Sequence, residues 1–594
     1  MRHFLTLCVS LILIIPLWAD NVSVEEAQSF AQKFFQQNAL TRSTVPQFQL
    51  VWDGSDAQTR NGLYPAVYVF NRTDANGFII ISGDDITYPV LGYSTKNKFL
   101  SNPLPSNVRY WIEHLEKEIN YLRSIHYKAS PTIEMAWDQP TLNENEPSVK
   151  LQTALWNQNE PYNRLCPQTP QGLSVSGCVS TAMGIIMKYY EWPDKGVGTI
   201  GGYTTSNPNL YVPSFVLGHE YDWTNMPLEY KKGSYTEAQA EAVARLIYDC
   251  GVMAESNYSA SATGALTHIA LRAMVEHMKY DKSVKLIDRD NYNLNSWDDL
   301  IRKELDANRP VLYGGVDASN GGHQFIIDGY TPDNYFSVNW GWGGLSNGNF
   351  LLSTLNPSNI GIGGGNGGGF RFYQNAAINL HPDKGGDYDV NLVLAAAQGN
   401  DGAWYEGLSS DTRYFETGKP FTLNVAFIFN YGLVTFDGDV MVGITDKDGT
   451  LKEILSIQHI DNLQSYYGTG FSTQCQINQP IARGDRIRVF YKKEGEWVRM
   501  DYKKETMAEI ILREEKALDE GTSITFNRTN RTLRIQSFFG TSYKILSTTD
   551  NSVRLEGKLT DSDRVTANPE QLPKGQYILE LSYENEKKTI TLTL

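Results

Sequence analysis

The chain has 594 residues, which at about 150 residues per domain predicts roughly four domains. Hydrophobic residues make up 41% and charged residues 20%, so the composition excludes a disordered chain. There are 67 acidic and 52 basic residues, giving a net charge of -15. This charge argues against nucleic acid or an anionic membrane surface as the main partner.

Residues 1–19, MRHFLTLCVSLILIIPLWA, combine the positive charge of Arg2 with an apolar run and a small residue, Ala19. This pattern predicts a secretory signal peptide, because the apolar run is too short to span a membrane. No later run approaches about 18 uninterrupted apolar residues, so we predict no transmembrane segment. The protein is therefore expected to be secreted, which places it in the periplasm, at the cell surface or outside the cell.

Residues 20–126 are predicted to form an α+β domain. A helix is expected over residues 24–37, with Ser23 as its N-cap and Glu26 three residues later. Strand-like runs follow at residues 48–52, 66–71 and 77–83, and a second amphipathic helix is expected over residues 107–126. Prolines and a polar NENEPS stretch in residues 127–150 are typical of an exposed linker.

Residues 151–382 are predicted to form a second α+β domain, because helical patterns come first and strands come after them. The expected helices are residues 178–191, 236–248 and 266–278, and the expected strands are 310–316, 323–330, 335–340 and 349–353.

Residues 386–594 show alternating apolar and polar runs separated by turn residues, such as FTLNVAFIF (421–429) and QYILELSY (576–583). Their length fits two all-β sandwiches, with expected bounds of 386–510 and 511–594.

The strongest candidate nucleophile is Cys178, in SVSGCVSTAM, which is expected at the first turn of a helix. Unpaired N–H groups and the helix dipole stabilise a thiolate there. A buried structural cysteine is the alternative, and taken alone it is the more common case. His323 begins a hydrophobic strand in GGHQFIIDGY and is a candidate general base, although a surface histidine at a strand start is the more common case for this segment taken alone.

Three further residues could complete such a site. Asn339 ends the strand YFSVN and could orient an imidazole, while the indole of Trp340 could shield that bond from water. Alone, NWGW reads as a tight aromatic turn. Gln158, in LWNQNEPYN, could hold an oxyanion together with the Cys178 N–H group, or could be a solvated loop residue.

Taken together, the segments WNQNEPYN, SGCVSTAM, GGHQFIIDGY and NWGWGG resemble the streptopain family of papain-like cysteine proteases. The resemblance covers residues 151–380 closely. It implies Cys178 as nucleophile, His323 as general base and acid, Gln158 as oxyanion donor, Asn339 as orienting amide and Trp340 as the adjoining indole. Residues 22–126 are similar to the inhibitory prodomain of that family, notably GFIIISGDDITYPVLGYS (77–94).

Other segments carry weaker signals. The run GIGGGNGGG (361–369) lacks the Lys-Ser/Thr pair of a phosphate-binding loop, and the resemblance implies a loop that borders the substrate cleft.

The start of a calcium-binding loop is imitated by Asp446, Asp448 and Gly449, but a hairpin turn is the expected structure. The five cysteines form no CxxC pair and the histidines no HExxH motif, so neither a metal nor a cofactor is predicted.

The sequence therefore predicts a secreted cysteine endopeptidase made as a zymogen. Its partners would be protein or peptide substrates and its own prodomain, which a cut within residues 127–150 would release. The resemblance implies a preference for substrates with an apolar side chain at the residue that precedes the one bearing the cleaved carbonyl. Two alternatives are a catalytically silent surface-displayed binding protein and a cell-wall amidase on a papain-like fold.

Overall fold

The computed structural model describes most of the chain. The described residues are 21–36, 45–54, 64–140, 147–289, 294–317, 321–353, 374–398, 404–405, 407–412, 415–482, 484–503, 506–512, 523–527, 532–536, 541–559, 564–566, 572–583 and 586–593. The predicted signal peptide and the glycine run at 361–369 lie outside these residues.

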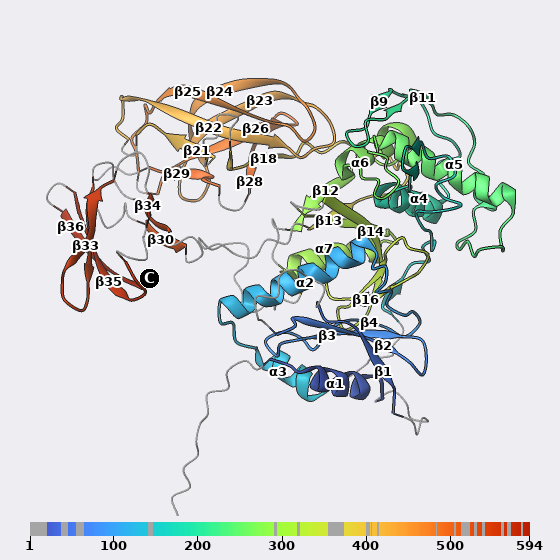
Figure 1. Ribbon diagram of the computed structural model, residues 1–594. Helices are drawn as coiled ribbons and strands as arrows, with labels where there is room; N and C mark the ends of the chain where they lie inside the picture. Colours follow the sequence, from blue (N-terminus) through green and yellow to red (C-terminus); the bar gives the residue numbers. More distant parts are fainter. Residues whose placement is uncertain are drawn as a thin grey trace, which may run out of the picture.

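The N-terminal unit consists of a four-stranded antiparallel sheet and three helices (Figure 1). Its elements are α1 Val24–Gln36, β1 Phe48–Trp52, β2 Val67–Arg72, β3 Phe78–Ser82, β4 Val90–Ser94, α2 Ser106–Ser124 and α3 Pro131–Asp138. The predicted cap of α1 is confirmed, because Ser23 Oγ accepts a hydrogen bond of 3.2 Å from the Glu26 N–H group.

The central unit begins with helices and ends with an antiparallel sheet, as the sequence predicted. Its helices are α4 Cys178–Tyr190, α5 Glu237–Met253, α6 Thr267–Met278, α7 Leu294–Asp306 and the short η1 Trp223–Asn225. Its main strands are β5 Val149–Lys150, β12 Lys285–Asp288, β13 Val311–Asp317, β14 Gly321–Tyr330, β15 Phe336–Asn339, β16 Gly348–Phe350 and β17 Gln374–Ile378. Three small hairpins pair β6 Gln168–Thr169 with β7 Gly172–Leu173, β8 Thr199–Ile200 with β11 Phe215–Val216, and β9 Tyr203–Thr204 with β10 Tyr211–Val212.

One continuous sheet joins the N-terminal and central units. The strand order of this eleven-stranded sheet is β1-β2-β3-β4-β16-β15-β14-β13-β17-β12, with β5 beside β14. The junction is the antiparallel pairing of β4 with β16, in which Tyr93 lies opposite Asn349 and Gly92 opposite Phe350. The two units are therefore connected by backbone hydrogen bonds as well as by side chains.

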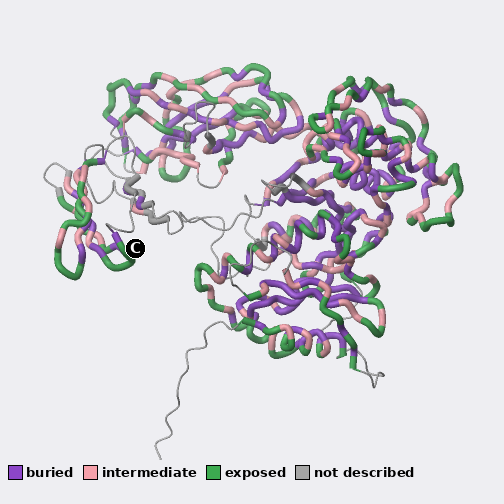
Figure 2. The backbone as a smooth tube through the Cα atoms, viewed as in Figure 1, coloured by how far each residue is buried: buried purple, intermediate pink, exposed green. Residues whose placement is uncertain are grey.

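The side chains of this sheet alternate between two faces, as strand geometry requires. On one face, α2 and α7 pack over a single core that includes Ile80 from β3, Tyr313 from β13 and Phe336 from β15. On the other face, α1 covers the N-terminal strands, while α4, α5 and α6 cover Leu312 and Ile326. Figure 2 shows this buried layer running through both units. The core under α2 thus belongs to both units.

The segment expected as an exposed linker contains regular structure. Pro131–Asp138 forms α3, and Trp137 of this helix packs edge-on against Phe30 of α1 with ring centroids 5.2 Å apart. The strand β5 already pairs with β14. Helix α3 was not predicted, although Ser130 caps it and Pro131 occupies its first turn, which is a recognisable start signal.

Every regular element that the structure describes within residues 386–594 is a strand. The first group is β18 Leu392–Leu394, β19 Ala397–Gln398, β20 Trp404–Tyr405, β21 Leu408–Ser410, β22 Pro420–Asn430, β23 Phe436–Thr445, β24 Leu451–Leu463, β25 Gly468–Gln476, β26 Arg486–Lys493, β27 Glu496–Arg499, β28 Asp501–Tyr502 and β29 Glu509–Ile511. The second is β30 Ser523–Asn527, β31 Thr532–Gln536, β32 Ser542–Ser547, β33 Val553–Lys558, β34 Arg564–Thr566, β35 Gln576–Tyr583 and β36 Glu586–Thr593. Their buried cores are separate, and the first extends to Leu512.

The turn at residues 446–449 connects β23 to β24. The Asp446 carboxylate accepts hydrogen bonds of 2.9 Å from the N–H groups of Asp448 and Thr450. This carboxylate therefore stabilises a hairpin turn, as predicted.

Candidate active site

Cys178 is the first residue of α4, a helix in which every residue from Val179 to Lys188 is buried. Gly177 precedes it with φ of 87°, and a Cβ atom there would lie 2.5 Å from the Thr263 carbonyl oxygen. Glycine is therefore required at this position, both for the backbone angle and for space. The sharp entry brings Cys178, which is half-buried, to the open N-terminus of the helix.

The surroundings of Cys178 have opposite effects on the pKa of its thiol. Burial raises the pKa of its thiol, whereas N–H groups of Gln324, Val179 and Cys178 itself lower that pKa. The Gln324 N–H group donates to Cys178 Sγ across 3.5 Å. Burial is the larger effect, so the pKa of the Cys178 thiol is raised overall in this form of the protein.

His323 lies on β14, one residue before Gln324, and pairs with Gly315 of β13. Its ring is in contact with Tyr110 of α2, with centroids 5.6 Å apart. A Cβ atom on Gly315 would lie 2.2 Å from Tyr110 Oη, so the absence of a side chain at Gly315 is what admits the tyrosine. A residue of the N-terminal unit thus occupies the space beside the predicted general base.

Asn339 is buried at the end of β15. Its Nδ2 donates to Thr153 Oγ1 (3.0 Å) and to the Ala154 carbonyl (2.9 Å). Its Oδ1 accepts from Gly341 N–H (3.2 Å) and from the Asn347 side chain (3.4 Å). His323 is not among these partners within the described residues.

Trp340 is 1% exposed and packs between the sheet and α2. Its ring centroid lies 4.6 Å from that of Phe325 and 6.0 Å from that of Trp111 in α2. Its Nε1 donates to the Ser346 carbonyl (3.0 Å), and its own carbonyl accepts from Asn107 of α2 (2.5 Å). The indole is therefore a core residue that also binds the N-terminal unit.

Gln158 is 7% exposed, so the solvated-loop alternative is wrong. Its carbonyl accepts from the Ser176 N–H group (3.0 Å) and from Ser176 Oγ (3.3 Å). Since Ser176 lies two residues before Cys178, these bonds fix the Gln158 loop next to the start of α4.

Two residues near the site carried no sequence prediction. Gln324 is a buried polar residue directly before the apolar run Phe325–Ile327 of β14, and that contrast was the available signal. Tyr110 lies on an amphipathic helix, in which a buried aromatic residue is expected to be part of the hydrophobic core. The sequence therefore offered no signal for its position beside His323.

The other described cysteines are buried. Burial raises the pKa of Cys166 to about 12 and that of Cys475 to about 11, and it raises the pKa of Cys250 well above its ordinary value. Cys250 Sγ contacts Met187 Sδ at 3.6 Å within the helical core. These thiols are inert packing groups, as predicted for Cys250.

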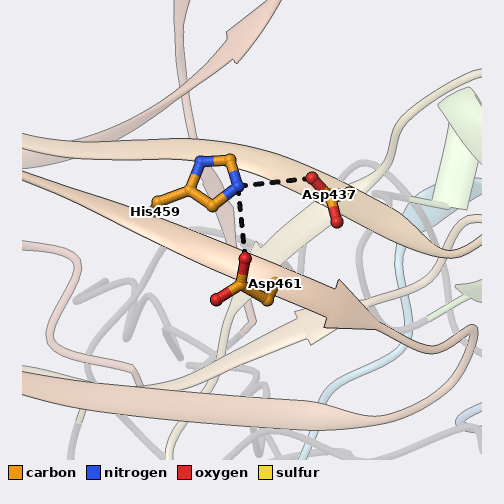
Figure 3. Close-up of side chains that lie close together, drawn as sticks. All are labelled: Asp437, His459 and Asp461. Carbon is orange, nitrogen blue, oxygen red and sulfur yellow. Dashed lines mark hydrogen bonds and ion pairs between the residues drawn. The ribbon is translucent and has the colours of Figure 1, made fainter.

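Two five-stranded sheets within β18–β29 share one buried core, and we call this unit the first sandwich. A cluster on the first sandwich resembles a metal site. Asp437 and Asp461 face His459 Nε2 at 3.3 and 3.5 Å (Figure 3), and Asp439 lies 2.8 Å from Nδ1. Hydrogen bonding to Asp439 is the main cause that raises the His459 pKa. The surrounding carboxylates therefore favour the imidazolium form of this ring. The cluster is an exposed ion-pair group.

Comparison with known proteins identifies relatives of both the N-terminal and the central unit. The Peptidase C10 family profile matches residues 156–350, and the Spi protease inhibitor profile matches residues 19–119. Streptopain from Streptococcus pyogenes is 35% identical over 332 residues, covering 53% of this chain and 81% of streptopain. Thiol protease/hemagglutinin PrtT from Porphyromonas gingivalis is 34% identical over 392 residues, covering 64% of this chain and 44% of PrtT.

Among solved structures, a mutant prointerpain A fragment from Prevotella intermedia is 29% identical, with a TM-score of 0.45 and coverage of 57% of this chain and 99% of that one. The two family profiles and the relatives define the class as a thiol peptidase preceded by an inhibitor-type domain. The chain belongs to the Peptidase C10 family. None of the described helices is long and apolar enough to cross a membrane.

Proposed function

We propose that the protein is a secreted cysteine endopeptidase made as a zymogen, with residues 20–126 as its own inhibitor. Its substrates are proteins or peptides, and the catalytic domain is papain-like and spans residues 151–382. The signal peptide is residues 1–19, and activation cuts the chain within residues 127–150.

The proposed reaction needs no metal and no cofactor. His323 takes the proton of the Cys178 thiol, and the thiolate attacks the peptide carbonyl carbon, with the oxyanion held by the Gln158 side chain and the Cys178 N–H group. His323 gives that proton to the leaving amine as the C–N bond breaks, which leaves a thioester. His323 then takes a proton from water as the water oxygen attacks the thioester carbon, the C–S bond breaks, the acid product leaves, and the proton returns to the sulfur. Asn339 orients the imidazole and Trp340 shields it.

The observation that carries this proposal is the Gln324 N–H group at 3.5 Å from Cys178 Sγ. This contact sets β14, with His323 as its adjacent residue, against the N-terminus of α4. A thiol at an open helix N-terminus next to a histidine fits acyl transfer better than structural packing. The test is digestion of casein by the activated protein, and its loss after labelling by an irreversible thiol-protease inhibitor. Digestion of peptidoglycan and not casein would support the amidase alternative.

Helix α2 supports the inhibitory role of the N-terminal unit. Tyr110 lies against His323, Trp111 lies against Trp340, and Asn107 donates to the Trp340 carbonyl. Glu118, which is fully buried, accepts a 3.2 Å hydrogen bond from Ser353. We infer that α2 keeps substrate away from Cys178 and constrains the imidazole until the unit leaves.

The first prediction concerns the activation cut. We expect the active form to begin within residues 147–150, because β5 and the residues after it are bound to the catalytic sheet. The Leu151 N–H group donates to the Asp328 carbonyl (2.7 Å), and Thr153 Oγ1 donates to the Asp328 carboxylate (2.6 Å). N-terminal sequencing of the active form measures the cut.

An active form that still begins near residue 20 would contradict the inhibitory role. A start beyond Gln158 would contradict the site, because the proposed oxyanion donor would be absent.

The second prediction concerns Asn339→Ala. We expect a smaller loss of kcat than for Cys178→Ala or His323→Ala, because Asn339 orients a group and makes no bond to substrate. It should also lower the melting temperature, since it removes the buried hydrogen bonds from the Asn339 amide to the Thr153 hydroxyl and the Ala154 carbonyl. Steady-state kinetics and thermal unfolding of all three variants provide the measurement. A larger loss of kcat for Asn339→Ala than for His323→Ala would contradict the assigned roles.

A further inference from the structure

The first sandwich is docked on the central unit through contacts on three of its segments. Leu433, in the loop between β22 and β23, joins the hydrophobic core that also contains α4, α5 and α6. Asp389 forms ion pairs with Lys285 of β12 and with Lys493 of β26. Lys503 lies 3.7 Å from the Asp288 carboxylate at the end of β12. The sandwich is therefore held on the central unit by both apolar and ionic contacts.

An aromatic stack also joins the two units. Tyr466 of the sandwich lies over His268 of α6 with ring centroids 3.9 Å apart and planes inclined by 7°. Burial and the nearby Arg272 lower the pKa of His268 to about 4. The imidazole is therefore neutral at ordinary pH, and the stack is one of two uncharged rings.

The sandwich holds Tyr466 rigidly. This residue occupies the turn between β24 and β25 in a left-handed conformation with φ of 63°. Its N–H group donates to the Asn430 carbonyl (2.7 Å), and the Asn430 N–H group donates to the Tyr467 carbonyl (2.9 Å). The Tyr466 ring also packs against Tyr431, with centroids 5.4 Å apart. The turn thus presents a fixed ring to α6.

Thr267, the residue before His268, connects α6 to Gln324, whose N–H group contacts the nucleophile. Thr267 is the first residue of α6, and its Oγ1 accepts a 2.8 Å hydrogen bond from Gln324 Nε2. The same amide group donates to Asn375 of β17 (3.3 Å). Gln324 is therefore anchored at its side chain, while its N–H group faces Cys178 Sγ.

These contacts form a continuous path from the sandwich to the reactive sulfur. We propose that residues 389–512 are a working part of the catalytic unit. Through Tyr466 the sandwich fixes the start of α6, and α6 in turn holds Gln324 in position to donate to Cys178. Tyr466, His268 and Thr267 are positioning residues, because none of them touches the reacting atoms. This inference rests on the proposed function of Cys178 as nucleophile.

The test replaces Tyr466 with alanine in the full-length protein and examines the activated form. We expect kcat on a peptide substrate to fall about threefold to thirtyfold with KM little changed, since coupling through packed side chains has this magnitude. We also expect the pH profile of Cys178 alkylation by iodoacetamide to move to higher pH, because a misplaced N–H group stabilises the thiolate less. A purely structural role would leave that profile in place.

Three variants serve as controls. Tyr467→Ala changes the neighbouring tyrosine, which is 64% exposed, and should match the wild type. Tyr466→Phe and His268→Phe keep stacked rings and should also stay near wild type. His268→Ala removes the stack from the catalytic side and should reproduce Tyr466→Ala. If Tyr466→Ala does not fold, the comparison of His268→Ala with His268→Phe decides the question.

The proposal is overturned if Tyr466→Ala or His268→Ala changes the melting temperature but leaves both kcat and the alkylation profile unchanged. Combining Tyr466→Ala with Gln324→Ala gives a further check, because residues on one path have effects that do not add. If the wild type digests no protein, the proposed function fails. The alkylation profile still reports on the coupling in that case, since iodoacetamide requires only a reactive thiol.

Discussion

Replacing Cys178 with alanine is expected to abolish hydrolysis, with a loss of about four orders of magnitude or more in kcat. The variant lacks the atom that forms the thioester, and neither binding nor the oxyanion donors can replace it. The fold should persist, because Cys178 is only half-buried and alanine keeps the Cβ atom and the helical backbone at the start of α4. Casein or peptide hydrolysis measures the first effect, and thermal unfolding measures the second.

A matched control is Cys166→Ala, which removes another buried thiol from the same unit and should retain activity. Uncut precursor should accumulate in the Cys178→Ala variant if the enzyme processes itself. Full hydrolysis by purified Cys178→Ala protein would refute the assignment of the nucleophile.

Replacing Trp111 with alanine is expected to release the inhibited state. This α2 residue is 1% exposed, and its ring lies 5.8 Å from Phe325 and 6.0 Å from Trp340. Removing a buried tryptophan from such a contact costs about 3 kcal/mol, equivalent to roughly a hundredfold change in an equilibrium constant. We therefore expect about hundredfold faster labelling of Cys178 by iodoacetamide in the uncut chain.

The uncut and cut forms are separated on a gel, so labelling of the precursor is read directly. Lys117→Ala, at an exposed position of the same helix, is the control and should label as slowly as the wild type. Slower or unchanged labelling of Trp111→Ala would mean that α2 does not restrain the site.

Local patterns in the sequence predicted five of the seven α-helices among the described residues. Helix α4 was expected at residues 178–191 and is found at Cys178–Tyr190, and α1, α2 and β1 agree to within two residues at each end. Apolar periodicity sufficed for α1 and α2, which each bury one face, whereas α4 is buried on all sides. Helix α7 was missed, because its first turns, LNSWDD, are rich in residues that are also typical of loops.

The site was predictable in residue type and chain order, but not in its contacts. Sequence could place His323 on a strand, yet it could not show that Tyr110 lies beside it, because that contact depends on the pairing of β4 with β16. The Asn339 amide was expected to face an imidazole, whereas its bonds in this form are to other groups. Such long-range contacts arise from tertiary packing and leave no periodic trace in the chain.

The junction between β4 and β16 also bears on how the cleaved protein behaves. Once the N-terminal unit departs, β16 changes from an interior strand into the border of a sheet, with unpaired N–H and C=O groups and a bared Phe350. An unpaired strand edge of this kind can pair with another strand, and β4 of the released fragment is the strand that paired with it before cleavage. Cleavage alone would then give a reversible product-inhibited complex, and lasting activity requires dilution or destruction of the fragment. At only three residues, Gly348–Phe350, the border is also too short to invite extended self-association.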